Sequence, residues 1–176
     1  MTRFILIYGS IAGIFIASLL IGGIMIAGAN GSAGSQLFGY LSMLVAMSII
    51  FVAVKRYRDT QLGGVIKFWP ALLLGAGIAA VASLFYVVAW EIYFNSTGGA
   101  WVETYVEQIR AQQAAEGRSA EEIDAYIAQT QDMMDLYRNW WFRIPITLTE
   151  ILPVGLLVGL VSAAILRNPR ILPRRA

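Results

Sequence analysis

Four long runs of apolar residues constrain this chain more than any other feature. The runs cover residues 4–29, 37–54, 68–94 and 144–166, and the first two contain no charged side chain. An α-helix rises about 1.5 Å per residue, so a run of about 20 residues crosses the ~30 Å hydrocarbon core of a bilayer. Backbone groups inside lipid need hydrogen-bond partners within their own helix. The sequence therefore predicts an all-α integral membrane protein, a single domain (residues 1–176) built on a bundle of four spanning helices.

The composition limits the chemistry that this chain could perform. Hydrophobic residues make up 58% of the sequence and charged residues 14%, whereas soluble proteins average roughly half and a quarter. The chain contains no cysteine and no histidine, which excludes disulfides, thiolate nucleophiles, imidazole bases and zinc-type clusters. We therefore predict no catalytic, cofactor-binding or metal-binding residues and no enzymatic activity.

Residues 95–143 differ sharply from the rest of the chain, because they hold eight of its 11 carboxylates. Apolar positions recur there at helical spacing, in one set before a turn at Gly117 and in a second set after it. Ser119 and Glu122 have the spacing of a capping box at the start of the second set. The segment is therefore predicted to be a helical hairpin outside the membrane, with its apolar stripes facing each other or capping the bundle. The apolar positions are Trp101, Tyr105 and Ile109, then Ile123, Tyr126, Ile127, Met133, Met134 and Tyr137.

Lysine and arginine are distributed unequally between the two sides of the predicted membrane. Nine of the 13 fall at the N-terminus, in the 55–67 loop or in the C-terminal tail, which ends with Arg174 and Arg175. Cytoplasmic loops carry such an excess, so both termini are predicted to be cytoplasmic in a bacterial inner membrane. The anchor residues of the 55–67 loop would contact lipid head groups, and no phosphate-binding loop or nucleic-acid partner is expected. These anchor residues are Lys55, Arg56, Arg58 and Lys67.

Two carboxylates lie inside apolar runs, Glu91 near the end of the third and Glu150 near the start of the fourth. A charge at a helix centre costs roughly 2.5 to 3.5 kcal/mol on insertion scales, so such residues are usually paired or functional. One interpretation pairs Glu150 with Arg143 or Thr147 on the same helix face. The other joins Glu91 and Glu150 in an ion or proton site, with the face of Glu91 turned into the bundle. That face also carries Gly77, Ala80, Leu84 and Val88.

The fourth run also carries a row of small residues at four-residue spacing. Gly155, Gly159 and Ala163 form this row, which allows another helix to approach closely. The row predicts a helix–helix contact within the bundle.

Several fragments resemble the bacterial membrane family known as domain of unknown function 4199. They are KRYRDTQLGGVIKFWPALLLG, WEIYFNSTG and TLTEILPVGLLVGLVSAAILRNPR, and the likeness covers essentially the whole chain. The resemblance implies a small four-span inner-membrane protein and no established activity. We expect a structural or interaction role, with the acidic hairpin binding an extracytoplasmic protein. The alternative is an ion- or proton-coupled transporter or sensor that uses Glu91 and Glu150. The sequence does not fix the oligomeric state.

Overall fold

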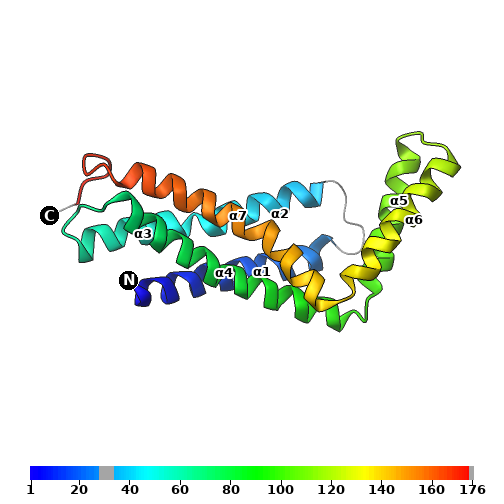
Figure 1. Cartoon of the computed structure of the whole chain (residues 1–176), viewed down its shortest axis with the longest axis horizontal. Helices are drawn as coiled ribbons and strands as arrows, with labels where there is room; N and C mark the ends of the chain where they lie inside the picture. The colour runs from blue at the N-terminus through cyan, green and yellow to red at the C-terminus, as the bar shows by residue number, and fades with distance from the viewer. Residues whose placement is uncertain (28–33, 175–176) are drawn as a thin grey trace.

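The computed structural model describes residues 1–27 and 34–174, and within these residues all the regular structure is α-helical (Figure 1). The predicted all-α fold is therefore confirmed, while Arg175 and the segment 28–33 lie outside the described residues. The helices are α1 (Thr2–Ala27), α2 (Gly34–Met47), α3 (Ile49–Gln61), α4 (Phe68–Ser96), α5 (Ala100–Ala115), α6 (Ala120–Tyr137) and α7 (Trp140–Leu166).

Four stretches of the described chain are long and apolar enough to cross a membrane, as the sequence predicts. They are Thr2–Met25, Gly39–Gln61, Phe68–Ser96 and Trp140–Leu166. The second stretch includes both α2 and α3, which meet at Ser48 with helical backbone angles (φ −58°, ψ −20°). The Ser48 hydroxyl donates to the Val45 carbonyl at 2.6 Å, a local bond of the kind that bends helices. The last span begins at Trp140, so the aromatic residues before Arg143 belong to the helix.

Small residues set a close contact between α4 and α7. Gly75 of α4 lies against Gly159 of α7, and a Cβ added to Gly75 would lie 2.9 Å from the Gly159 Cα. One turn away, a Cβ on Gly155 would lie 2.6 Å from the Ala79 Cβ. Gly155, Gly159 and Ala163 are all buried. Two members of the small-residue row of the fourth span, Gly155 and Gly159, thus lie in close contact with α4, as expected when small side chains let helix backbones meet.

Replacing Gly75 with leucine is expected to destabilise the protein by about 1 to 3 kcal/mol, because overpacking forces backbones apart. The nearest atom to the new side chain is Gly159 backbone, which cannot rotate away. Unfolding in mixed detergent micelles would measure the change. Gly22→Leu is the matched control, since a Cβ there meets nothing within 4 Å. Equal stability of the two variants would show that the Gly75–Gly159 contact is not tight.

The face of α4 that carries Glu91 does not point into the bundle along its length. Leu84 is 60% exposed and Val88 is 56% exposed, and Ala80 is exposed as well. Only Gly77 of the predicted inward set packs on another helix, against Ile5 of α1. The prediction of an inward face is therefore wrong for Ala80, Leu84 and Val88. The other side of α4 packs on α7, because the small residues lie there.

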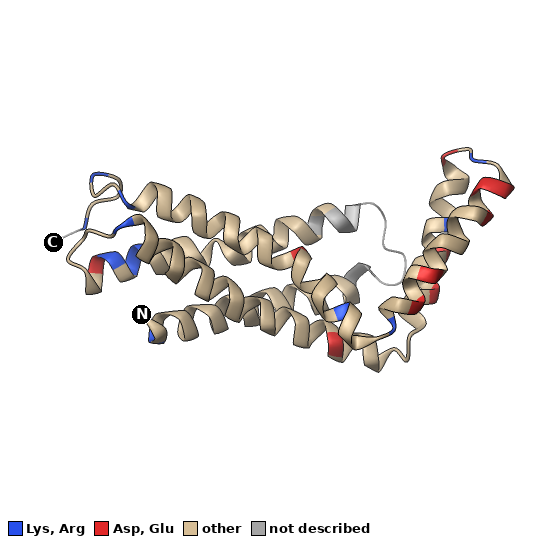
Figure 2. Cartoon of the chain, viewed as in Figure 1, with Lys and Arg blue, Asp and Glu red and all other residues tan. Residues whose placement is uncertain are grey.

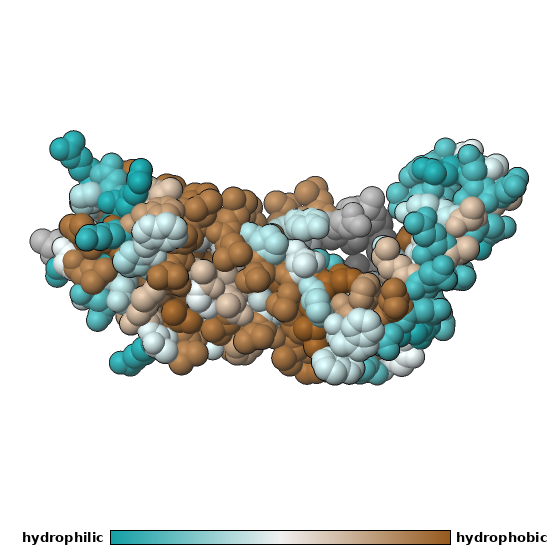
Figure 3. Space-filling model, viewed as in Figure 1, coloured by the Kyte–Doolittle hydropathy of each residue, from teal (hydrophilic) through white to brown (hydrophobic). Residues whose placement is uncertain are grey.

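Helices α5 and α6 pack against each other and project from one end of the bundle, crosswise to its long axis (Figure 1). Acidic side chains gather on this hairpin, while lysine and arginine gather at the opposite end, which we call the basic end (Figure 2). The bundle between them presents an apolar surface (Figure 3). This division matches a membrane protein with two unlike water-exposed ends.

The start of α6 confirms the predicted capping box. The Glu122 amide donates to the Ser119 hydroxyl, and the Ser119 amide donates to the Glu122 carboxylate at 2.9 Å. These bonds from Ser119 hold the pKa of Glu122 below its ordinary value. Ile123, Ile127 and Met134 are buried, whereas Tyr126 and Met133 are 44% and 53% exposed. Tyr126 and Met133 thus lie on a second face of α6, outside its buried stripe.

Candidate functional site

Arg143, in the first turns of α7, carries a charge that is buried at the hairpin end of the bundle. Its side chain is only 2% exposed, and its guanidinium binds both oxygens of Glu91 on α4. Nε donates to Glu91 Oε1 at 2.6 Å, and Nη2 donates to Glu91 Oε2 at 2.6 Å. This fork-to-fork geometry is the strongest form of a carboxylate–arginine pair. The pair ties α7 to the last turns of α4.

The remaining guanidinium nitrogen of Arg143 reaches the hairpin. Nη1 donates to the backbone carbonyls of Tyr137 at 3.1 Å and Arg138 at 3.0 Å. These carbonyls lie at the C-terminal end of α6, where the last backbone acceptors of a helix lack partners within the helix and favour a cation. The guanidinium also lies 3.9 Å from the centroid of the Phe94 ring. One side chain thus fastens α4, α6 and α7 together.

An aromatic cluster surrounds this ion pair. Trp90 Nε1 donates to the Tyr137 hydroxyl at 2.8 Å, and the Trp90 and Trp101 rings meet edge to face at 5.1 Å. The Phe94 ring lies 5.8 Å from the Tyr137 ring. Burial raises the pKa of Tyr137, and hydrogen bonds with Thr147 and Trp90 oppose that rise in part. The cluster excludes water from one side of the guanidinium, which strengthens its attraction to Glu91.

Three of the four residues proposed for an intramembrane polar site meet here. Glu91 and Arg143 form the ion pair, and the buried Thr147 hydroxyl donates to the Arg143 carbonyl at 3.0 Å. Glu150 does not join them. It is exposed on α7 and has no hydrogen bond or ion pair with any side chain that the structure describes. The two carboxylates thus form no common site in the described structure.

The expected pairing of Arg143 with Glu150 is wrong, for a geometric reason. The two residues share a face of α7 but lie seven residues apart, about 10 Å along the axis. Long side chains on a helix lean toward its N-terminus, so Arg143 extends away from Glu150 and toward the end of α6. This direction brings the guanidinium to Glu91.

A second buried arginine, Arg58 of α3, lies at the basic end. Its side chain is fully buried, and Nε donates to the Asp59 carboxylate at 2.8 Å. Its other nitrogens donate to the carbonyl of Leu166, the last residue of α7, and to the carbonyls of Ile171 and Leu172 after the helix. Arg58 was predicted to be a lipid anchor, and that prediction is wrong because its donors bind the protein backbone.

The other anchor residues remain available to the surface at the basic end. Arg56 and Lys67 are exposed. Lys55 is partly exposed and binds Asp59 at 2.6 Å. These three residues keep the charge and position expected of an anchor at a membrane surface.

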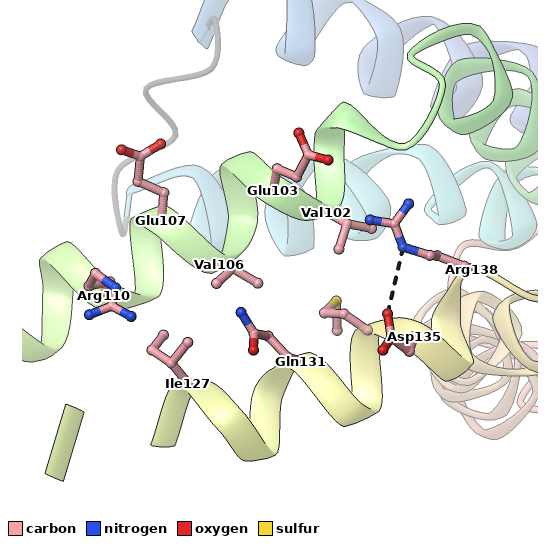
Figure 4. A pocket seen from close by; sticks show the side chains of 10 residues that line it. Val102, Glu103, Val106, Glu107, Arg110, Ile127, Gln131, Asp135 and Arg138 are labelled. Atoms are coloured by element: carbon pink, nitrogen blue, oxygen red, sulfur yellow. Dashed lines mark ion pairs between the residues drawn. The ribbon is translucent and has the colours of Figure 1, made fainter. Parts of the chain in front are cut away.

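A groove of about 500 Å³ runs between α5 and α6 on the hairpin (Figure 4). Val102 and Val106 enter it from α5, and Ile127 enters it from α6, while Arg110 and Arg138 lie at its two ends. Glu103 and Glu107 lie along its α5 edge. In the described part of the chain, no cluster of three or more acidic residues is arranged to hold a metal ion. The groove thus combines apolar side chains on its walls with charged side chains at its edges and ends.

In the described part of the chain, four helical stretches long and apolar enough to cross a membrane, with a charged helical hairpin at one end, indicate a multi-pass α-helical membrane protein. Residues 7–168 match the family described as Protein of unknown function (DUF4199), and the chain belongs to that family. Searches among curated proteins and among solved structures give no match.

Proposed function

We propose that this protein is a non-catalytic membrane protein that holds the α5–α6 hairpin in a fixed position for binding another protein. The observation that carries the proposal is Arg143, whose guanidinium binds Glu91 of α4 and the last carbonyls of α6 together. A hairpin joined to the bundle only by short connections would move freely on its own. A buried ion pair at the joint keeps its surface in one orientation, and this lowers the entropic cost of binding a partner.

The groove on the hairpin supplies a surface for such a partner. Its apolar floor includes Val106 and Met134, and Gln131 adds a polar group. Apolar centres with charged rims are typical of protein interfaces. The hairpin is predominantly acidic (Figure 2), so a partner with basic residues around an apolar centre fits it best.

The alternative proposal, ion or proton transport by Glu91 and Glu150, has less support. Such a site needs two carboxylates that share a proton or a cation. Both oxygens of Glu91 are occupied by Arg143, and Glu150 lies elsewhere on α7. The proposed role as a binding platform uses Glu91 as a structural counter-ion and leaves Glu150 outside the mechanism.

We further propose that the hairpin lies outside the cytoplasm of a bacterial inner membrane, with both termini inside. The support is the excess of lysine and arginine at the basic end, since these residues favour the cytoplasmic side. A reporter active only in the cytoplasm should work when fused after Arg174 or inserted near Thr60. The same reporter should fail when inserted at Gly117, at the tip of the hairpin. Activity at Gly117 would reverse the orientation.

Photo-cross-linking in intact cells tests the proposed binding role. A photoreactive amino acid at Gln131, in the groove, is expected to give a discrete adduct with another protein. Gln129 is the matched control, because it is exposed on the same helix but lies about 200° around the axis. Reversing the charge of Glu103 and Glu107 should reduce the Gln131 adduct. The absence of adducts from Gln131 and from Val106, or equal adducts from Gln129, would contradict the proposal.

A further inference from the structure

Each helix of the hairpin has one face without charge. On α5 the residues are Trp101, Tyr105, Gln108 and Gln112, and on α6 they are Tyr126, Thr130, Met133 and Tyr137. Both sets follow the spacing i, i+4, i+7, i+11, which places their members along one side of a helix. We call these two sets together the uncharged face of the hairpin.

The inner ends of the uncharged face show which way it points. Trp101 and Tyr137 both contact Trp90, near the end of α4, through the edge-to-face ring contact and the hydroxyl bond described above. Both helices therefore turn this face toward the end of the bundle. The hairpin extends sideways from that end (Figure 1), so the outer part of the face is directed toward the plane of the membrane surface.

Charged side chains occupy the opposite side of both helices. At about 100° per residue, Glu103 and Arg110 lie about 160° to 180° around α5 from Trp101. Asp124 and Asp135 lie about 160° to 180° around α6 from Tyr126. Glu116 and Glu122, at the tip of the hairpin, are exceptions. Glu116 accepts a hydrogen bond from Gln112 at 3.1 Å, and the Glu122 carboxylate is turned back to Ser119 in the capping box. The hairpin is thus amphipathic as a unit, with its groove on the charged side.

The uncharged face continues into the aromatic residues at the start of α7. Tyr126, Met133 and Leu136 are 44%, 53% and 47% exposed, and Trp140 and Trp141 are 66% and 56% exposed. Tryptophan and tyrosine favour the boundary between lipid and water, where the ring is in an apolar setting and its polar atom is hydrated. We propose that the uncharged face rests on the bilayer surface, with Tyr126 and Met133 in contact with zwitterionic lipid head groups.

The charge of the hairpin determines the type of lipid. Interfacial helices usually carry lysine and arginine, which attract anionic lipids. This hairpin is acidic, so an anionic surface repels it and a zwitterionic surface does not. Most of the acidic residues lie on the side of the hairpin opposite the uncharged face, so they would point away from the bilayer in this orientation. The proposal goes beyond the binding role above.

Spin labelling of the full chain in nanodiscs of phosphatidylcholine tests this orientation. The natural sequence has no cysteine, so Met133→Cys and Gln131→Cys each introduce one labelling site. Both positions are exposed, so a label at either is expected to leave the fold intact. The relaxation of the spin label at residue 133 should be accelerated by dissolved oxygen, which enters lipid, but not by a water-soluble nickel chelate. The label at 131, on the groove side, should be accessible to nickel.

Three results would overturn the proposal. Equal nickel access at 133 and 131 would mean that the face is in water, and protection of 133 from both oxygen and nickel would mean that protein covers it. The third result concerns lipid charge. If nickel access at residue 133 does not increase when phosphatidylglycerol replaces most of the phosphatidylcholine at low salt, an anionic surface does not repel the hairpin. The cross-linking experiment at Gln131 does not depend on these outcomes, so the two proposals can fail separately.

Discussion

Replacing Arg143 with methionine is expected to destabilise the folded protein by about 3 to 5 kcal/mol, the usual cost of removing one partner of a buried ion pair. The change leaves Glu91 without its counter-ion and leaves the Tyr137 and Arg138 carbonyls without their donor. The variant keeps the four apolar spans, so it should still insert in the membrane. Unfolding in mixed micelles, followed by circular dichroism, would measure the loss.

Two further variants separate the ion pair from the packing around it. Arg143→Lys keeps the charge but cannot bind two carboxylate oxygens and two carbonyls at once, so it should recover less than half of the loss. Adding Glu91→Met to Arg143→Met removes the unpaired carboxylate and should restore part of the stability. If Arg143→Met alone has wild-type stability, the guanidinium is not what fastens the hairpin.

Replacing Arg58 with methionine is expected to cost about 3 kcal/mol and to release the segment after α7. The guanidinium is the donor for two carbonyls of that segment and for the Leu166 carbonyl at the end of α7, and its removal leaves all three without this donor. Trypsin should then cleave faster after Arg167 and Arg170. Arg56→Met is the control, because Arg56 belongs to the same basic cluster but is exposed, and surface changes usually stay within about 0.5 kcal/mol. Unchanged cleavage in Arg58→Met would contradict the role assigned to this residue.

The main elements of the fold could be predicted from the sequence because their signals are local. Apolar runs of membrane length, an acidic insertion and the Ser119–Glu122 spacing each act through residues close together in the chain. The spacing of Gly155 and Gly159 likewise indicates a helix contact. The same spacing does not identify the partner, which is Gly75 of α4.

The ion pair could be predicted only in part, because its partners are far apart in sequence. Arg143 and Glu91 are separated by 52 positions. Because Arg143 and Glu150 are close together on one helix, the sequence favoured Glu150 as the partner of Arg143. Side chains on a helix lean toward its N-terminus, however, and this direction takes Arg143 away from Glu150. Trp90 and Phe94 are four residues apart and flank Glu91 in the sequence. This spacing was the available signal for an aromatic site around the Glu91 carboxylate.

The role of Arg58 could not be read from the sequence at all. A cluster of basic residues at a membrane boundary has the same composition whether its members face lipid head groups or the backbone. What distinguishes Arg58 is that the segment after α7 folds back over it, and no local pattern encodes that contact. Arg56 and Lys67, which remain exposed, fit the anchor role that the composition suggested.

The most direct test of the hairpin's attachment is a distance distribution between spin labels at Gln131, on α6, and Thr60, at the basic end. Both positions are exposed, and the cysteine-free chain allows the two labels to be placed alone. If Arg143 holds the hairpin to the bundle, pulsed electron paramagnetic resonance should give one narrow distance distribution in the otherwise natural chain. The distance distribution in Arg143→Met should be broad. A broad distribution in both proteins, or an equally narrow one, would contradict the role of Arg143.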